Sequence, residues 1–386
     1  MKLIIQPNDG VSPILFAIKK AKKSIDIAIF RCDRKDVVVA LKNAAERGVK
    51  VTALIAHTNR GGEKNLRKLE SAFLAAGVIV ARTADDLIRY HDKYIIIDQQ
   101  ILLALSFNFT FLDIDHSRGF GIITRNDKLV QEAIKLFQAD CTRSAYSPSS
   151  EAVVISPENS RKVLTTFVQR AKKQLLIYDP KITDDELLRT LKARLNAGVE
   201  LRIIGKISKQ NGFDARKLGT ERLHTRTIIR DAKQAFVGSQ GLRPAELDSR
   251  RELGLIIHDA KIVKKLIDTF EADWSASAAK SAPVAIEKKE TSLAAQTPQE
   301  SKELEQEVRE EQSKKDAEKA VQVLEKELDP LTTSVKKVVK KAVAKVGDEV
   351  LTDKQVKDTM KKVVKKAVKT AVKQAVQESE RNAVAS

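Results

Sequence analysis

Two eight-residue segments of the chain hold the residue types that attack and stabilise phosphate. Residues 91–98 read HDKYIIID and residues 224–231 read HTRTIIRD. Each segment has a histidine, a basic residue two positions later and an aspartate seven positions later. A histidine beside a fixed cation is suited to attack on phosphorus, because the cation stabilises charge on the phosphate oxygens. The candidate catalytic residues are therefore His91, Lys93, His224 and Arg226.

Hydroxyl and amide side chains follow both segments at the same interval. Ser106 lies fifteen residues after His91, and Ser239 lies fifteen residues after His224. Asn108 comes two residues after the first of these serines. Because hydroxyl and amide groups donate hydrogen bonds to phosphate oxygens, the two serines and the asparagine are candidate phosphate-binding residues.

The apolar run at residues 94–97 predicts a buried strand that begins just after the first basic residue. Residues two apart on an extended chain point to one side, so His91 and Lys93 are expected to face one pocket. Strands alternate with helices that end at glycines, which predicts an α/β fold. In the first half, the expected strands are residues 3–6, 24–30, 49–55, 94–97, 101–105 and 119–124. The expected helices there are residues 11–23, 36–47, 63–76 and a segment that ends near 141.

The pattern then restarts, which predicts an internal repeat with a boundary near residues 147–150. In the second copy, the expected strands are residues 152–155, 174–178 and 199–205, and the expected helices are 158–173 and 185–196. The predicted organisation is a first repeat at 1–146, a second at 151–275, a linker at 276–299 and a charged helical tail at 300–386. The tail is acidic before Pro330 and basic after it.

The composition indicates a polyanionic partner. The formal net charge is +18, while only 4% of residues are aromatic, so stacking platforms for bases are scarce. The two cysteines, Cys32 and Cys141, form no CxxC pair, and no metal-ligand cluster is visible, so neither a metal nor another cofactor is expected. The N-terminal apolar run is short for a signal peptide, and no stretch has the length of a membrane-spanning helix. A cytoplasmic protein is expected, with peripheral membrane contact left open.

The paired segments and paired serines resemble the phospholipase D superfamily, which includes phospholipases D, cardiolipin synthases and related nucleases. The resemblance covers residues 1–274 and implies two α/β repeats packed about a pseudo-twofold axis, with one shared site. It implies that His91 attacks phosphorus and that His224 protonates the leaving alcohol, without a metal. It also implies that Asp98 and Asp231 are supporting residues.

The second copy departs from the family pattern. Position 226 is arginine where lysine is usual, and Gly241 stands where the first copy has Asn108. The family has a further carboxylate that orients a histidine of the opposite repeat. Glu252 is at that position in the second copy, so it is expected to support His91. The first copy has Gly119 there, so His224 is expected to lack a partner unless Asp113 or Asp115 reaches it.

These observations favour a phosphodiesterase that hydrolyses a phospholipid or transfers its phosphatidyl group to an alcohol. Two alternatives stay open: a nuclease of the same superfamily that acts on DNA or RNA, and an inactive module that binds polyanions. The basic helix of the tail has valine and alanine on one side and lysine on the other. Two roles stay open for the tail. The acidic helix before Pro330 could pair with the basic helix after it, as a hairpin or an oligomerising coil. The basic helix could instead contact an anionic membrane surface or nucleic acid.

Overall fold

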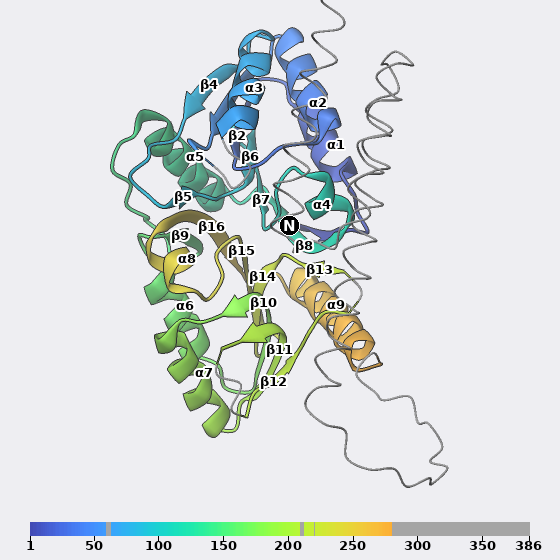
Figure 1. Ribbon diagram of the computed structural model, residues 1–386, viewed down its shortest axis with the longest axis vertical. Helices are drawn as coiled ribbons and strands as arrows, with labels where there is room; N and C mark the ends of the chain where they lie inside the picture. The colour runs from blue at the N-terminus through green and yellow to red at the C-terminus, as the bar shows by residue number, and fades with distance from the viewer. Residues whose placement is uncertain (59–62, 209–211, 220, 280–386) are drawn as a thin grey trace, which may run out of the picture. The chain divides into compact units, whose positions relative to one another are not determined.

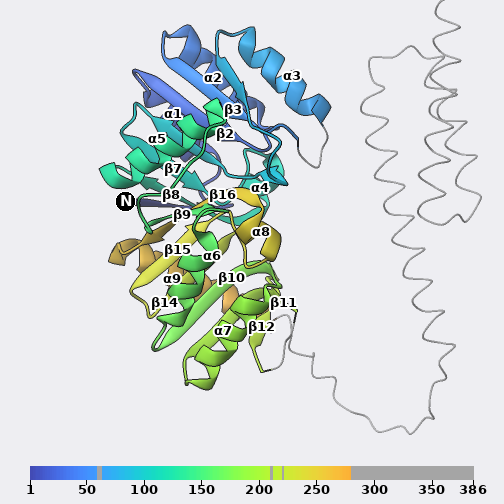
Figure 2. The ribbon, with the colours of Figure 1, turned by 90° about the vertical axis from the view of Figure 1, so that its left-hand side faces the viewer.

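The computed structural model of the chain describes residues 1–58, 63–208, 212–219 and 221–279. Within them lie two eight-stranded mixed sheets flanked by helices (Figures 1 and 2). The predicted α/β fold is confirmed. The predicted charged tail, and the linker beyond residue 279, lie outside the described residues.

The first sheet has the strand order β1-β8-β7-β6-β2-β3-β4, with β13 (Arg222–Leu223) paired to β8. The strands β2, β3 and β4 are parallel, while β6, β7, β8 and β1 are antiparallel to their neighbours. The strands are β1 (Lys2–Gln6), β2 (Ser24–Ile29), β3 (Lys50–Ile55), β4 (Ile79–Arg82), β6 (Tyr94–Ile97), β7 (Ile101–Leu105) and β8 (Ser117–Thr124). The helices of this half are α1 (Ser12–Lys20), α2 (Lys35–Glu46), α3 (Glu63–Leu74), α4 (Phe111–Asp115) and α5 (Asp127–Thr142).

The second sheet repeats this arrangement with the order β12-β11-β10-β14-β15-β16-β5, and β9 pairs with β16. Its parallel part is β10–β11–β12, and β14, β15 and β9 are antiparallel to their neighbours. The strands are β9 (Val153–Ser156), β10 (Gln174–Ile182), β11 (Glu200–Ile207), β12 (Asp214–Arg216), β14 (Arg226–Arg230), β15 (Gln234–Gly238) and β16 (Arg250–Ile257). The helices are α6 (Ser160–Gln169), α7 (Asp185–Asn196), α8 (Pro244–Asp248) and α9 (Ala260–Ala279).

Two short strands cross between the halves. The strand β5 (Arg89–Tyr90) belongs to the first half but pairs in parallel with β16 of the second sheet. In return, β13 (Arg222–Leu223) of the second half pairs in parallel with β8 of the first sheet. This reciprocal exchange is what a pseudo-twofold axis between two repeats requires. Each crossing strand ends directly before a motif histidine, so the exchange brings both histidines to the seam between the halves.

The seam itself is an apolar core. Rings of both sheets and of α9, the last helix of the described residues, pack edge to face across it. Phe120 of β8 lies 5.5 Å from Tyr178 of β10, which lies 5.0 Å from Phe270 of α9. All three side chains are buried, and they belong to a core cluster that both halves share. Each half also has a core of its own under its outer helices. Close packing of this kind fixes the two halves relative to each other, so a site at the seam is held rigidly.

Several elements differ from the sequence-based expectation. The two-residue strands β5 and β13, the short strands β4 and β12, and the one-turn helices α4 and α8 were not expected, because elements this short show no periodicity. The strands β14, β15 and β16 and the helix α9 also lie outside the expected ranges. The strand β8 begins at Ser117 rather than at 119. The helix α9 continues to Ala279, past the expected start of the linker at 276, because alanine and serine there are compatible with a helix.

Candidate active site

Both motif histidines are attached to the opposite half of the molecule through their backbones. The amide of His91 donates to the carbonyl of Arg251 in β16 at 2.8 Å. The amide of His224 donates to the carbonyl of Arg118 in β8 at 3.1 Å. His91 and Lys93 thus lie in the connection before β6 rather than within that strand. The position of each histidine depends on the neighbouring repeat as well as on its own.

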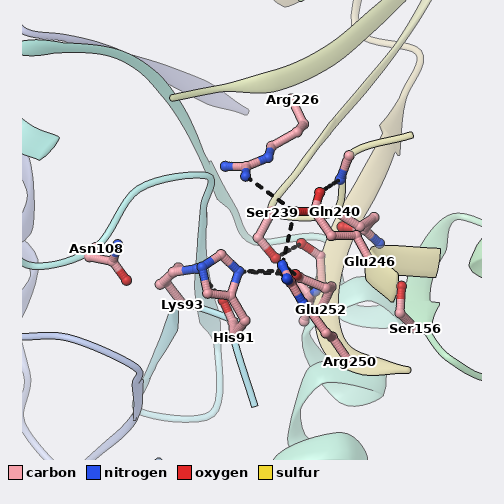
Figure 3. Close-up of polar contacts among 12 residues, drawn as sticks. His91, Lys93, Asn108, Ser156, Arg226, Ser239, Gln240, Glu246, Arg250 and Glu252 are labelled. Atoms are coloured by element: carbon pink, nitrogen blue, oxygen red, sulfur yellow. Dashed lines mark hydrogen bonds and ion pairs between the residues drawn. The ribbon is translucent and has the colours of Figure 1, made fainter. Parts of the chain in front are cut away.

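Glu252 holds the ring of His91 (Figure 3). The Nδ1 atom of His91 lies 2.8 Å from one carboxylate oxygen of Glu252 and 3.0 Å from the other. Glu252 is fully buried and His91 is 8% exposed. A carboxylate at Nδ1 accepts the ring proton there, so the lone pair of the neutral imidazole is placed on Nε2. This is the tautomer that a histidine nucleophile needs.

The surroundings of His91 keep its ring neutral. Burial lowers the pKa of His91 well below its usual value, and the positive charges of Lys93 and Arg226 lower that pKa further. The ring also packs edge to face on Phe30, with 4.6 Å between the centroids. A neutral imidazole has the free lone pair that attack on phosphorus requires.

The two basic motif residues have equivalent contacts in the two halves. The Lys93 ammonium donates to the carbonyl of His91, and the Arg226 guanidinium donates to the carbonyl of His224 at 2.7 Å. Both side chains are buried, and burial lowers the pKa of Lys93 to about 7. A second nitrogen of Arg226 lies 3.6 Å from Glu246 of α8 (Figure 3). Arginine at this position therefore keeps the place that lysine has in the first half.

Charges of the two halves act on one another, which indicates a single site. The cation of the second half, Arg226, lowers the pKa of His91. The pKa of His224 is lowered first by burial, and Lys93 of the first half is among the cations that lower it further. Geometry places both histidines beside the opposite half: Glu252 of the second half lies 2.8 Å from His91, and Asp113 of the first half lies 3.6 Å from His224.

The two serines lie under the site, each linked to the next strand. The Ser106 hydroxyl accepts from the amide of Phe120 at 2.9 Å, and the Ser239 hydroxyl accepts from the amide of Leu253 at 3.2 Å. Both serines are fully buried. A hydrogen bond from Ser239 also lowers the pKa of Glu252, although burial, the larger effect, raises it overall. These contacts give the serines a supporting role, and their binding of phosphate stays a prediction.

Asn108 and Gly241 occupy equivalent loops that differ in the carboxylate beside them. Asn108 donates from its backbone amide at 2.9 Å and from Nδ2 at 2.6 Å to Asp113 of α4. The amide of Gly241 donates to Glu246 of α8 at 2.7 Å. A Cβ atom at 241 would lie 2.5 Å from a carboxylate oxygen of Glu246, so the longer glutamate leaves no room for an asparagine. The second amide hydrogen of Asn108 is still available for a phosphate oxygen.

The carboxylate missing from the first half has a steric explanation. A Cβ atom at Gly119 would lie 2.9 Å from Cδ1 of Phe107, whose ring fills the space that a longer side chain would need. In the second half, Gln240 follows Ser239 as Phe107 follows Ser106, and its Nε2 donates to the carbonyl of Val154 at 2.8 Å. The second half therefore has room for the side chain of Glu252, whereas the ring of Phe107 leaves room only for glycine at position 119.

The motif aspartates close turns away from the catalytic groups. Asp98 accepts from the backbone amides of Lys22, Lys23 and Ser24 at 2.6–3.1 Å. Asp231 accepts in the same way from three amides at residues 172–174. These contacts join the start of β2 or β10 to the end of the motif strand. They account for the aspartate in each motif without a chemical role.

Some charged residues at the site were not singled out from the sequence. Glu246 accepts hydrogen bonds from Arg243 and Arg250 and forms an ion pair with Arg226 at 3.6 Å. It lies seven residues after Ser239. Asp113, which the sequence already offered as a possible partner of His224, lies seven residues after Ser106, so this shared interval is the signal that could have found Glu246. In the described part of the chain, no three histidine, cysteine or acidic side chains are grouped so as to hold a metal ion.

A buried acid pair lies on the other side of the His91 segment. Asp92 and Asp140 are each at most 3% exposed, and one carboxylate oxygen of each has no hydrogen-bond partner among the described residues. Arg251 donates to the other oxygen of Asp140 at 3.1 Å. Burial and mutual repulsion raise the pKa of Asp92 to about 8, and burial raises that of Asp140 to about 7. The second half has the neutral Thr225 in place of Asp92.

We expect Asp92→Asn to stabilise the protein at alkaline pH. Because the folded-state pKa of Asp92 lies above its unfolded value near 3.8, folding of the wild-type chain loses stability as pH rises from about 4 to about 8. The variant lacks this titration, so its stability advantage should grow as pH rises and reach up to about 5 kcal/mol, or on the order of 10 °C in Tm, at pH 9. Thermal melts of both proteins from pH 5 to pH 9 measure the difference. A difference in Tm between the two proteins that stays the same from pH 5 to pH 9 would contradict the prediction.

Comparison with known proteins agrees with this geometry. The family described as cardiolipin synthase, PLD-like domain, matches residues 14–141 and 164–274, more than half of the chain. Polyphosphate kinase from Staphylococcus haemolyticus is 24% identical over 226 residues, which are 51% of this chain and 30% of that protein. Polyphosphate kinase from Helicobacter pylori is 20% identical over 297 residues, which are 70% of this chain and 44% of that protein. This chain therefore spans less than half the length of these two relatives.

Solved structures share the fold at low sequence identity. Polyphosphate kinase from Porphyromonas gingivalis matches with a TM-score of 0.60 and 19% identity, over 71% of this chain and 50% of that chain. Phosphatidylserine synthase from Haemophilus influenzae matches with a TM-score of 0.52 and 12% identity, over 71% of this chain and 85% of that chain. Among the described helices, none is both long and apolar enough to cross a membrane. The family match covers both halves and both motifs, and the chain therefore belongs to the phospholipase D-like family.

Proposed function

We propose that the chain is a phosphodiesterase of the phospholipase D type, which cleaves a phospholipid through a phosphohistidine on His91. The observation that carries the proposal is the buried contact between Nδ1 of His91 and Glu252 at 2.8 Å. This contact leaves Nε2 as the nucleophilic nitrogen, next to the cations Lys93 and Arg226, which would stabilise the phosphate charge.

In the first step, Nε2 of His91 attacks phosphorus and the bond from phosphorus to the leaving oxygen breaks. The protonated ring of His224 gives its proton to that oxygen, so an alcohol leaves rather than an alkoxide. Glu252 stabilises the positive charge that develops on the ring of His91. The non-bridging phosphate oxygens would be held by Lys93, Arg226 and the side-chain amide of Asn108.

In the second step, neutral His224 accepts a proton from water or from an acceptor alcohol. The oxygen of that acceptor attacks phosphorus, and the bond from phosphorus to Nε2 of His91 breaks. His91 returns to its neutral form and His224 to its protonated form, so the site is regenerated. Water gives hydrolysis, and an alcohol gives transfer of the phosphatidyl group.

A phospholipid is favoured as the substrate by the family description, which names cardiolipin synthase. A second candidate is polyphosphate, because both curated relatives are polyphosphate kinases. The same nucleophile would then attack a phosphoanhydride, with a phosphate in place of the leaving alcohol. A nucleic acid is the third possible diester, in keeping with the net charge of +18.

The test is a substrate panel with the full chain and its His91→Ala and His224→Ala variants. The arms are phosphatidylcholine and phosphatidylglycerol vesicles, single- and double-stranded DNA, and polyphosphate with ADP. We expect turnover of a phospholipid, its loss in both variants, and activity that persists in EDTA. Turnover of DNA or of polyphosphate alone would replace the phospholipid with that substrate. Binding without turnover in any arm would contradict the proposal and favour an inactive polyanion-binding module.

A further inference from the structure

His224, the general acid of the proposed mechanism, lacks the carboxylate that His91 has in Glu252. Gly119 is the counterpart of Glu252, and the ring of Phe107 lies in the space where a side chain at 119 would begin. His224 is 9% exposed, and its Nδ1 atom has no hydrogen-bond partner among the described residues. A histidine in this setting is poorly protonated unless another negative charge compensates.

Asp113 supplies that charge from a different place in the fold. One of its carboxylate oxygens lies 3.6 Å from Nε2 of His224, the one ion-pair contact of His224 in the described part of the chain. Asp113 is 4% exposed and lies in α4. The helix begins at the Thr110 cap, whose hydroxyl accepts from the amide of Asp113 at 3.2 Å. The carboxylate is therefore fixed by the helix end rather than by the strand that holds Glu252 in the other half.

The hydrogen bonds of Asp113 keep it ionised and aimed across the seam. Asn108 of the same half donates to the oxygen that faces His224, and Arg222 of the opposite half donates to the other oxygen. Burial raises the pKa of Asp113, but His224, Asn108 and Arg222 outweigh burial and lower that pKa below its usual value. An ionised carboxylate so placed can stabilise an imidazolium ring.

We propose that Asp113 is the positioning residue of His224, which compensates for the carboxylate lost at Gly119 by stabilising the protonated ring across the seam. The inference rests on the proposed function, because it assigns His224 as the general acid. It makes the two halves of the site unequal: Glu252 serves the nucleophile from a strand, while Asp113 serves the acid from a helix end.

The charges that face His224 determine whether a substitution raises or lowers its pKa. Burial lowers its pKa, and Arg226 of β14, Arg222 of β13 and Lys93 before β6 lower it further. Asp113 of α4 raises it. Asp113→Asn should therefore lower the pKa of His224, and Arg222→Gln should raise it. Asp115→Asn is the matched control, because Asp115 lies in the same helix but pairs with Arg34.

The primary measurement does not need turnover. The chain has five histidines, so NMR of histidine-labelled full-length protein resolves few rings, and His224→Asn assigns the one in question. Inorganic phosphate is added to fill the anion site. We expect Asp113→Asn to lower the titration midpoint of His224 by about one pH unit, Arg222→Gln to raise it, and Asp115→Asn to leave it unchanged. Asp113→Glu should keep the wild-type midpoint, because it retains the charge.

Activity provides the second measurement. In the pH–rate profile of phosphatidylcholine cleavage, the fall in rate at alkaline pH reports loss of the proton from the general acid. This fall should move to lower pH in Asp113→Asn and to higher pH in Arg222→Gln. If Asp113→Asn does not fold, as a thermal melt would show, Asp113→Ser removes the same charge and is measured in its place.

The outcomes separate the two proposals. An unchanged or higher midpoint of His224 in Asp113→Asn, or a wild-type His224 that stays neutral down to pH 5, would overturn the role of Asp113. The expected midpoints in a protein that turns over no phosphodiester would support the role of Asp113 while the proposed function fails.

Discussion

Replacement of His91 by asparagine should abolish both steps of the reaction, whereas replacement of His224 should spare one of them. The distinction appears with bis(p-nitrophenyl) phosphate, because nitrophenolate leaves without a proton. His224→Asn should release one burst of nitrophenolate, equal to the enzyme concentration, and then turn over slowly. His91→Asn should give no burst, because the nucleophile is missing.

The phospholipid substrate should respond differently. Its alcohol needs a proton to leave, so His224→Asn should lower the rate of phosphatidylcholine cleavage by about 10³-fold, the usual range for a lost general acid. Stopped-flow absorbance measures the burst, and trapping with labelled substrate measures the phosphohistidine. His258→Asn is the control, since His258 is exposed and contacts Gln234 rather than the site. A burst in His91→Asn would show that His91 is not the nucleophile. The absence of a burst in His224→Asn would show that His224 is needed for the first step even when the leaving group needs no proton.

The spacing of residues along the sequence was sufficient to predict which groups are candidates for catalysis. The motif histidines, their basic neighbours and the following serines recur at fixed intervals, because strand pairing within each repeat preserves these spacings. β6 pairs with β7, and β14 pairs with β15, in matching register. The α/β alternation followed from helices and strands long enough to show periodicity. These are local properties, and local properties are visible in a sequence.

The contacts across the seam could not be predicted in the same way. The strands β5 and β13 have two residues each, so no pattern marks them, yet they carry the histidines to the opposite half. The exclusion of a carboxylate at Gly119 depends on where the ring of Phe107, twelve residues earlier, points in the folded chain. The pairing of Asp92 with Asp140 depends on the packing of α5 behind the motif. Each of these features follows from tertiary packing rather than from spacing.

Glu252→Gln should reduce kcat by about 10²–10³-fold while the protein stays folded. Glutamine keeps the length of the side chain and can still accept from Nδ1 of His91, so the tautomer is retained. It cannot stabilise the positive charge that develops on the ring when Nε2 bonds to phosphorus. Loss of one preorganised electrostatic contact in a buried site commonly costs this much in rate.

The defect should lie in formation of the phosphoenzyme. The burst rate with bis(p-nitrophenyl) phosphate should fall together with kcat, because the leaving group there needs no acid and only the nucleophile is impaired. Glu132→Gln is the matched control: Glu132 is also buried, but it accepts from Tyr146 and Ser149 away from the site. Both variants should have similar melting temperatures. A Glu252→Gln variant with a wild-type burst rate would show that the buried contact with His91 orients the ring but contributes no charge stabilisation, and the first step of the mechanism would have to be rewritten without it.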